Sequence, residues 1–372
     1  MTDLPRLPSL NRRSLLAGSG AIAAAAVLPL HPAQAAIKTV GFIYVGSKDD
    51  YGYNQSHAEG AAAVRKMGVS VVEQERVPET VACANAMESM IQLDGATLLF
   101  PTSFGYFNPY MLKASAKNPS VTFMHCGGLW AAGDPANAHS YFGYIDEAVY
   151  VSGIVAGHMT KTKKFGFVAA KPIPQVLRNI NAFLLGAQSV DPSITCQVIF
   201  TGDWFLPVRE AEATNSLADQ GADVITCHVD SPKVVIQTAE SRGLMSCGYH
   251  VDQAPLAPKG YLTGAEWNWT YLYPKWIGEM QAGSTLPNYI RGGFKQQFIK
   301  SSAYNASVPA SARAQADAAR AGFTAGNFAI FKGPVKDNKG NTVIAAGTVL
   351  DEHDKTLESM DYLVAGVAGS AS

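Results

Sequence analysis

Short apolar runs rich in β-branched residues alternate with longer stretches of helical period, and this alternation constrains the fold of the chain more than any other feature. One set of runs begins at residues 39–45 and a second set begins at residues 164–169. Continuous apolar runs separated by helices are typical of parallel strands that are buried on both faces of a sheet. The sequence therefore predicts an α/β chain with two doubly wound βαβ lobes.

The C-terminal part of the chain departs from this alternation. Residues 307–322 are rich in Ala and predict a helix, and residues 328–331 and 342–344 predict the two arms of a hairpin. The segment between those arms contains Asp, Asn and Gly at 337–341, which is turn chemistry. A short helix over 357–367 is expected to close the chain.

The first 35 residues have the pattern of an export signal. Arg6, Arg12 and Arg13 precede a charge-free run over 14–30, and Ala33 and Ala35 form a small-x-small cleavage site. The run is shorter than the ~20 apolar residues that a lasting membrane anchor needs. Paired arginines directly before the run favour a twin-arginine signal, with an ordinary Sec signal as the alternative. Both predict a protein released into the periplasm, without a lipid anchor.

Charge and cysteine content exclude some classes of function. Lys and Arg number 29 and Asp and Glu number 30, so no basic field exists to attract nucleic acid. Only the N-terminal run raises the question of a membrane span, which excludes an integral transporter. The five cysteines are an odd number and several lie in apolar runs, so we expect mostly free, buried thiols.

Candidate ligand-binding residues follow the carboxyl ends of the predicted strands, where open α/β sheets bind their ligands. Aromatic side chains recur at these ends among Asn, Asp and Ser, a combination that suits a planar polar ligand held between two lobes. The residues expected at the site are Tyr53, Asn54, Ser103, Phe104, Trp204, Phe205, Asp230, Tyr249, Asp252, Trp267 and Asn268. The alternative is that these rings only pack between the lobes. For any single ring we favour this alternative, whereas for the whole set we favour ligand binding.

Common catalytic and metal-binding templates are missing from the sequence. There is no G-x-S-x-G, G-x-x-x-x-G-K-[ST], H-E-x-x-H or G-x-G-x-x-G segment. Cys227, His228, Cys247 and His250 contain the side chains of a zinc site, but their spacing is not that of a zinc finger. We therefore expect no catalytic residues, no metal and no cofactor.

Eight ordered segments resemble the basic membrane protein family, the substrate-binding proteins of ABC importers that include purine-nucleoside receptors. The resemblance runs from about residue 37 to residue 367. The segments are 41–46 (GFIYVG), 50–54 (DYGYN), 101–106 (PTSFGY), 153–157 (GIVAG), 172–176 (PIPQV), 180–183 (INAF), 185–187 (LGA) and 360–364 (MDYLV).

The resemblance implies a type I periplasmic-binding-protein fold, with two Rossmann-like lobes joined by a three-strand hinge and a ligand clamped between them. It implies that Tyr53 and either Trp204 or Phe205 sandwich a purine. It also implies that Asp252 binds ribose hydroxyls and that Lys295 lies near the sugar or the base. Gln175 stands where the family usually has Glu, and Leu206 where close relatives have Asp. Because two carboxylates of the family pattern are missing, the ligand could be either a free base or a nucleoside.

We therefore expect an export signal over 1–35, a first lobe from 36–143 with about 265–291, a second lobe from 144–264 with about 292–356, and a C-terminal helix and tail over 357–372. The expected protein is the periplasmic solute-binding component of an ABC importer, which delivers a purine base or nucleoside to an inner-membrane permease. Two alternatives remain. One is a sugar or amino-acid-like solute, whose carboxylate Arg178 could clamp, and the other is an exported nucleoside-processing enzyme.

Overall fold

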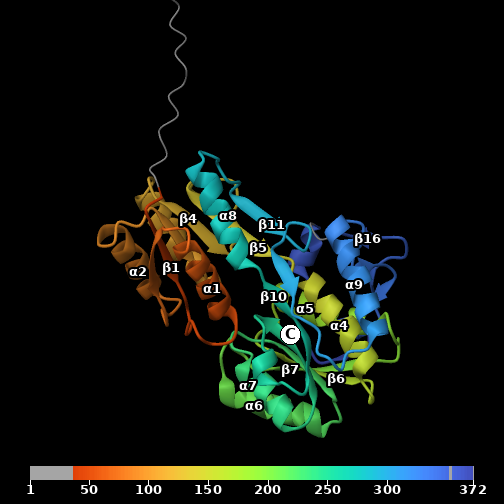
Figure 1. The fold of residues 1–372 in the computed structure, drawn as a ribbon. Coiled ribbons are helices and arrows are strands. Elements are labelled where there is room, and N and C mark those ends of the chain that lie inside the picture. Colours follow the sequence, from red (N-terminus) through yellow and green to blue (C-terminus); the bar gives the residue numbers. More distant parts are fainter. Residues whose placement is uncertain (1–36, 352–353, 372) are drawn as a thin grey trace, which may run out of the picture. The chain divides into compact units, whose positions relative to one another are not determined.

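Two sheets of mainly parallel strands organise the described part of the chain (Figure 1). The computed structural model describes residues 37–351 and 354–371, so the predicted export signal lies outside the described residues. The first sheet has the order β11-β5-β4-β3-β1-β2 and all its pairs are parallel. Its strands are β1 (Thr39–Ile43), β2 (Ser70–Gln74), β3 (Leu98–Pro101), β4 (Thr122–Cys126), β5 (Ala138–Gly143) and β11 (Tyr289–Gly292).

The second sheet has the order β12-β10-β9-β8-β6-β7-β17, and within it only the β10–β12 pair is antiparallel. Its strands are β6 (Lys164–Ala169), β7 (Thr195–Phe200), β8 (Val224–His228), β9 (Met245–His250), β10 (Tyr261–Trp267), β12 (Ile299–Ser301) and β17 (Val367–Ala368). Every residue of β3, β8 and β10 is buried, as the continuous apolar runs predict for strands covered on both faces.

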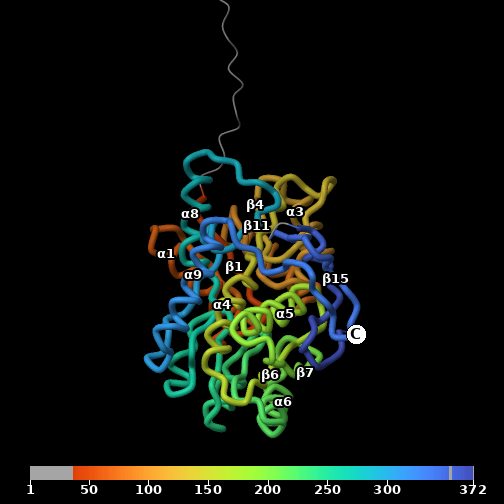
Figure 2. Tube along the Cα trace, turned by 90° about the vertical axis from the view of Figure 1, so that its right-hand side faces the viewer, coloured from red at the N-terminus to blue at the C-terminus, as the bar shows by residue number. Residues whose placement is uncertain are grey.

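Helices cover both sheets, and the parallel strands are connected through them. The first lobe consists of the first sheet with α1 (Tyr53–Arg65), α2 (Val81–Gln92), α3 (Leu112–Lys117) and α8 (Trp269–Gln281). The second lobe consists of the second sheet with α4 (Asp146–Met159), α5 (Pro174–Gln188), α6 (Pro207–Asp219), α7 (Lys233–Ser241) and α9 (Ala310–Ala325). Helices α1 and α8 lie side by side in Figure 1, and α4 and α5 lie side by side in Figure 2.

Two glycines allow α4 and α5 to pack backbone against backbone. A Cβ atom on Gly153 would lie 2.1 Å from the Phe183 carbonyl oxygen, and one on Gly186 would lie 2.2 Å from the Tyr150 carbonyl oxygen. No other residue fits at these two contacts, because real Cβ atoms do not approach so closely. The two glycines therefore fix the distance between the helices, and α5 carries Gln175 at its first turn.

The chain passes between the two sheets three times. Strand β5 of the first sheet is followed by α4, which packs on β10 of the second sheet. Strand β10 is followed by α8, which packs on α1 of the first lobe, and β11 of the first sheet is followed by β12 of the second. The predicted boundary near 265 shifts slightly, because β10 stays in the second sheet through Trp267.

Two predictions for the C-terminal part are wrong. Strand β13 (Phe331–Lys332) pairs with β16 (Val349–Leu350), whereas β14 (Val335–Lys336) pairs with β15 (Thr342–Ile344). The predicted turn over 337–341 is present. Pro334 lies between β13 and β14, and it has no backbone N–H to donate, so the two strand pairs do not join into one continuous hairpin. Segment 357–367 is not a helix: it contains the end of a 3-10 turn (Lys355–Ser359) and the start of β17.

Contacts with α5 explain why the closing segment is extended. The Asn181 Oδ1 atom accepts from the Val364 amide at 2.8 Å, and its Nδ2 atom donates to the Tyr362 carbonyl at 2.9 Å. The Asn181 side chain thus provides hydrogen-bond partners for backbone groups of this segment, which do not need partners within a helix. Across the described ranges, no helix is both long enough and apolar enough to cross a bilayer.

Candidate functional site

A pocket lies at the carboxyl ends of strands from both sheets. The first lobe contributes residues at the start of α1, after β3 and along β4 and β5. The second lobe contributes residues at the start of α5 and after or within β7, β8, β9 and β10. The lining residues are Tyr53, Ser103, Phe104, Cys126, Gly127, Phe142, Gln175, Trp204, His228, Asp230, Tyr249, His250 and Trp267.

The ring of Tyr53 is held rigidly at the first-lobe wall. Its hydroxyl donates to the Thr102 carbonyl at 2.6 Å, and its ring meets His57 edge-on with 4.6 Å between ring centroids. His57 lies against Tyr273, whose hydroxyl contacts the His57 Nδ1 atom. Because both neighbours are fully buried, the Tyr53 ring has little freedom to turn. It presents a preformed aromatic face to the pocket.

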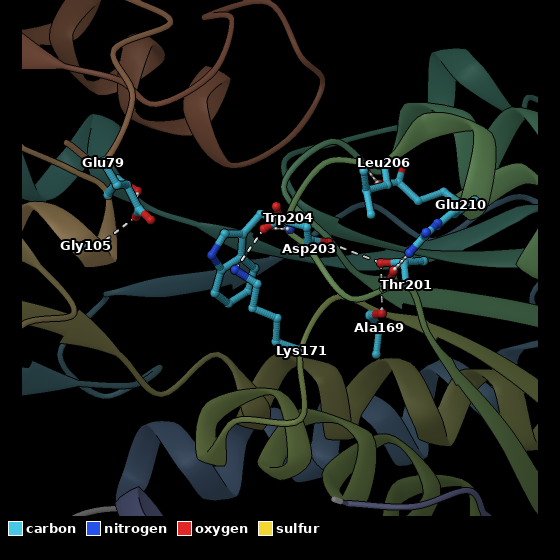
Figure 3. A network of polar contacts seen from close by, with 11 residues as sticks. Glu79, Gly105, Ala169, Lys171, Thr201, Asp203, Trp204, Leu206 and Glu210 are labelled. Carbon is cyan, nitrogen blue, oxygen red and sulfur yellow. Dashed lines mark hydrogen bonds and ion pairs between the residues drawn. The ribbon is translucent and has the colours of Figure 1, made fainter. Parts of the chain in front are cut away.

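The second-lobe ring, Trp204, is positioned by the loop that follows β7. Its backbone N–H donates to the Asp203 Oδ1 atom at 2.9 Å, and the same oxygen forms an ion pair with the Lys171 Nζ atom at 2.8 Å. Figure 3 shows the Lys171 side chain running beside the Trp204 ring, with Nζ 5.3 Å from the ring centroid. A cation close to an indole ring is attracted to it, so Lys171 holds both the loop and the ring.

Glu210 fixes the far end of this loop. Its Oε1 atom accepts from the Leu206 amide at 2.7 Å, whereas its Oε2 atom is buried and has no hydrogen-bond partner among the described residues (Figure 3). Burial raises the pKa of Glu210 to about 7. The loop that carries Trp204 is therefore bonded at one end by an exposed ion pair and at the other by a buried carboxyl group.

Two histidines of the second lobe line the pocket as neutral rings. Burial lowers the pKa of His228 to about 3 and lowers the pKa of His250 well below its ordinary value. The Nδ1 atom of His250 accepts from the Trp267 indole at 2.8 Å, which leaves its proton on Nε2, 3.1 Å from the Val229 carbonyl. The Nδ1 atom of His228 accepts from Asn179 at 2.9 Å. These rings therefore add aromatic surface without charge.

Asp230 is the one acidic side chain among the described lining residues, and none of them is Lys or Arg. Burial raises the pKa of Asp230 well above its ordinary value, and the nearby carboxylate of Asp50 raises it further. The carboxyl therefore retains its proton more readily than an exposed one, and it can donate as well as accept a hydrogen bond. The pocket thus combines aromatic walls with a single carboxyl group and no cation.

The two lobes contact each other directly beside the pocket, through the segment over 50–53. The Tyr53 amide donates to the Asp230 carbonyl at 2.8 Å, and the Ser231 hydroxyl donates to the Asp50 carbonyl at 2.7 Å. The Gln253 Nε2 atom donates to the Tyr51 carbonyl at 2.8 Å. Gly52 lies between these bonds, and a Cβ atom there would be 1.9 Å from the Asp230 carbonyl oxygen. The structure is therefore a closed arrangement of the lobes.

The structure brings together seven of the residues expected at the site: Tyr53, Ser103, Phe104, Trp204, Asp230, Tyr249 and Trp267. Trp204 lines the pocket, whereas its neighbour Phe205 is 57% exposed and does not line it. Tyr51 points elsewhere, with the Lys233 Nζ atom 5.6 Å from its ring centroid.

Four further expected residues also have places outside the pocket lining. Asn54 is buried and bonds to Gly46 and Asp50 within its own lobe. Asn268 donates to the Gln297 carbonyl at 3.0 Å, and Lys295 lies beside Gly326. The Asp252 carboxylate accepts from the Ala254 amide at 2.9 Å and is exposed. The two groups expected near a ribose, Asp252 and Lys295, thus do not line this pocket.

The expected set omitted six lining residues: Cys126, Gly127, Phe142, Gln175, His228 and His250. Position alone could have identified half of them, since Cys126, His228 and His250 end β4, β8 and β9. Phe142 lies within β5, and no sequence signal distinguishes it from a core residue. Within the described residues, no group of three or more His, Cys, Asp and Glu side chains could hold a metal ion.

Comparison with known families and sequences gives a consistent result. Residues 37–308 match the family model described as ABC transporter substrate-binding protein PnrA-like. A purine-binding protein of Brucella abortus is 34% identical over 330 residues, which cover 88% of this chain and 92% of that protein. A putative ABC transporter glucose-binding protein of Haloferax volcanii is 32% identical over 267 residues, which cover 71% of this chain and 66% of that protein.

Solved structures show the same fold. A solute-binding protein from Conexibacter woesei superposes with a TM-score of 0.66 at 21% identity, covering 78% of this chain and 97% of that one. A transcriptional activator of the comK gene from Bacillus halodurans superposes with a TM-score of 0.67 at 22% identity, covering 77% of this chain and 97% of that one. The prediction of a type I periplasmic-binding-protein fold is confirmed.

Proposed function

Because this chain belongs to the PnrA-like family of ABC transporter substrate-binding proteins, we propose that it binds a free purine base between its lobes and delivers it to the permease. The observation that carries the proposal is the pocket itself. Two aromatic residues from opposite lobes, Tyr53 and Trp204, line it together with one carboxyl group and no cation. Neutral aromatic walls with few polar groups fit a flat heterocycle.

Stacking would supply much of the affinity. A base stacked on an aromatic side chain gains about 1–3 kcal/mol. Each hydrogen bond to the base edge adds about 0.5–1.5 kcal/mol, and Asp230 can both donate and accept. The purine-binding protein of Brucella abortus supports this ligand class, since its likeness covers 88% of the chain.

A free base fits the pocket better than a nucleoside does. A ribose adds hydroxyl groups, and buried hydroxyls need hydrogen-bond partners. Asp252 and Lys295, which the family resemblance assigns to the sugar, do not line the pocket, and the His228 and His250 rings are already bonded to protein groups. The remaining acidic group, Asp230, is better matched to the edge of a base.

An amino-acid ligand finds no support at this site. Its carboxylate needs a cation, and Arg178 was the candidate for that role. Arg178 is buried and forms an ion pair with Asp146 at 2.7 Å, and it does not line this pocket. A sugar remains the second candidate because the Haloferax volcanii relative is a putative glucose-binding protein, although a sugar needs more free hydrogen-bonding groups than this pocket offers.

Titration calorimetry of the purified protein tests the proposal. We expect binding of at least one of adenine, guanine, hypoxanthine and xanthine, and no binding of glucose or amino acids. Trp204→Ala should weaken that binding by about 1–3 kcal/mol, whereas Phe205→Ala should leave it unchanged, because only Trp204 lines the pocket. Failure of all four bases to bind, or equal effects of the two variants, would overturn the proposal.

A further inference from the structure

A second cavity lies beside the pocket, toward the crossovers between the lobes. We call it the hinge cavity. It is larger than the pocket. The two spaces share six lining residues: Phe104, Gly127, Phe142, Gln175, His228 and Tyr249. The shared residues place the two spaces next to each other.

Beyond the shared wall, the lining of the hinge cavity is mainly apolar. Tyr144 and Ile145 come from the first crossover, and Ile173 and Pro174 from the start of α5. Leu129 comes from a loop and Leu357 from the 3-10 turn over Lys355–Ser359. Six such side chains around one space provide dispersion contacts and exclude water from whatever occupies it. This lining differs from the pocket, where histidines and Asp230 supply polar atoms.

The charged residues of the hinge cavity are paired with one another. The Arg178 Nε atom lies 2.7 Å from the Asp146 Oδ2 atom, and both side chains are less than 10% exposed. The Arg178 guanidinium also lies 4.8 Å from the Tyr144 ring centroid. Arg291 faces Glu358, with 3.7 Å between their nearest charged atoms. Each charge is thus balanced by an opposite one, so the cavity does not require a charged ligand.

From this geometry we propose that the ligand is a purine base with an apolar substituent, which occupies the hinge cavity while the base occupies the pocket. The proposal rests on the proposed function and narrows its ligand class. An unsubstituted base would leave the larger, apolar space unfilled. The charged groups of the hinge cavity are already paired with one another, so the hydroxyls of a ribose there would compete with those ion pairs for partners. An alkyl or aryl group gains affinity there with each carbon that it buries.

Calorimetry with a graded series of ligands measures this gain. The series contains adenine, N6-methyladenine, N6-propyladenine and N6-benzyladenine, a parallel set of N-alkylated xanthines, and the nucleosides adenosine and inosine. For at least one substitution position we expect affinity to rise about fourfold with each added methylene, the equivalent of roughly 0.8 kcal/mol. No gain at any position, or nucleosides that bind tighter than their bases, would overturn the inference.

Variants that fill the hinge cavity test whether the additional affinity of the substituted bases comes from that cavity. Ile173→Trp should abolish the advantage of the substituted bases and leave the affinity for the unsubstituted base unchanged. Leu129→Trp provides a second filling variant that does not depend on core packing, since Leu129 is 59% exposed. Leu93→Trp is the control, because Leu93 is 81% exposed and lies outside both cavities. An advantage that survives in both filling variants would contradict the proposal.

The binding results distinguish the proposed function from the assignment of the hinge cavity. If none of the four unsubstituted bases binds, the proposed function is wrong. If unsubstituted bases bind and the substituted ones bind no better, the proposed function stands and the assignment of the hinge cavity is wrong.

Discussion

The backbone amide of Tyr53 donates a hydrogen bond to the backbone carbonyl of Asp230 at 2.8 Å, and the side chains of both residues line the same pocket. A contact between the lobes and two walls of the site are therefore formed by the same two residues. If the lobes move about a hinge, as in other hinged binding proteins, their closure would assemble the site at the same time.

Gly52 should be required for that closure. A Cβ atom at this position would lie 1.9 Å from the Asp230 carbonyl oxygen, so Gly52→Val should hold the lobes apart and weaken ligand binding by roughly tenfold or more. Calorimetry measures the affinity, and small-angle scattering measures the opening. Gly278→Ala is a matched control, because a Cβ atom there meets nothing within 4 Å. Unchanged affinity in Gly52→Val would contradict this role.

Asp230 and Asp252 should differ in their effect on binding, although the family resemblance assigned the ligand contact to Asp252. Asp230→Ala removes the one acidic group of the pocket lining and should cost about 1–3 kcal/mol of binding free energy, or roughly 5- to 150-fold in affinity. Asp252→Ala removes only the bond to the Ala254 amide at the surface and should leave affinity unchanged. The opposite order of effects in calorimetry would show that the closed site is assembled differently.

Glu210 should give the protein a pH-dependent stability. Burial raises the pKa of Glu210 from 4.5 to about 7 in the folded state. Between these two values the unfolded state loses the proton while the folded state retains it, so the free energy of unfolding should fall as the pH rises from 4.5 to about 7. At 1.36 kcal/mol for each pKa unit, the loss is on the order of 3 kcal/mol.

Urea unfolding at pH 5 and pH 8 measures this dependence. Glu210→Gln should lack the loss between the two pH values, whereas Glu212→Gln should retain it, because Glu212 is exposed on the same helix. Parallel pH profiles for the wild type and Glu210→Gln would indicate that other groups control the stability.

The thiols should be unreactive in the folded protein. All five cysteines are free and buried, and burial raises the pKa of Cys83 to about 11 and those of Cys126 and Cys196 to about 12. Since the thiolate is the reactive form, a chromogenic disulfide reagent at pH 8 should detect no thiol before unfolding and five afterwards. Fast reaction of any thiol in the native protein would contradict the packing around it.

Export should depend on Arg12 and Arg13. The twin-arginine prediction implies that the double variant Arg12→Lys, Arg13→Lys retains the protein in the cytoplasm, because the charge is kept while the arginine pair is lost. Cell fractionation measures the distribution, with Arg6→Lys as the control. Normal export of the double variant would favour the Sec alternative.

The sequence by itself determined the fold class and the positions from which the site is built. Apolar runs such as the one within 223–227 predicted buried parallel strands between helices, and ligands of such sheets bind beyond the strand ends. Tyr53, Trp204 and Asp230 were found in this way, because position along the chain fixes which end of the sheet a residue occupies.

Only the tertiary structure decided which side chains at those ends line the pocket. Trp204 lines the pocket and the adjacent Phe205 does not, because Lys171, Asp203 and Glu210 fix the orientation of their loop. His250 adopts a left-handed backbone with a φ of 80°, so the chain turns and Asp252 ends at the surface. The closing segment at 362–364 is extended because Asn181, far away in sequence, bonds to it. Such orientations depend on contacts between distant segments, which local sequence patterns do not encode.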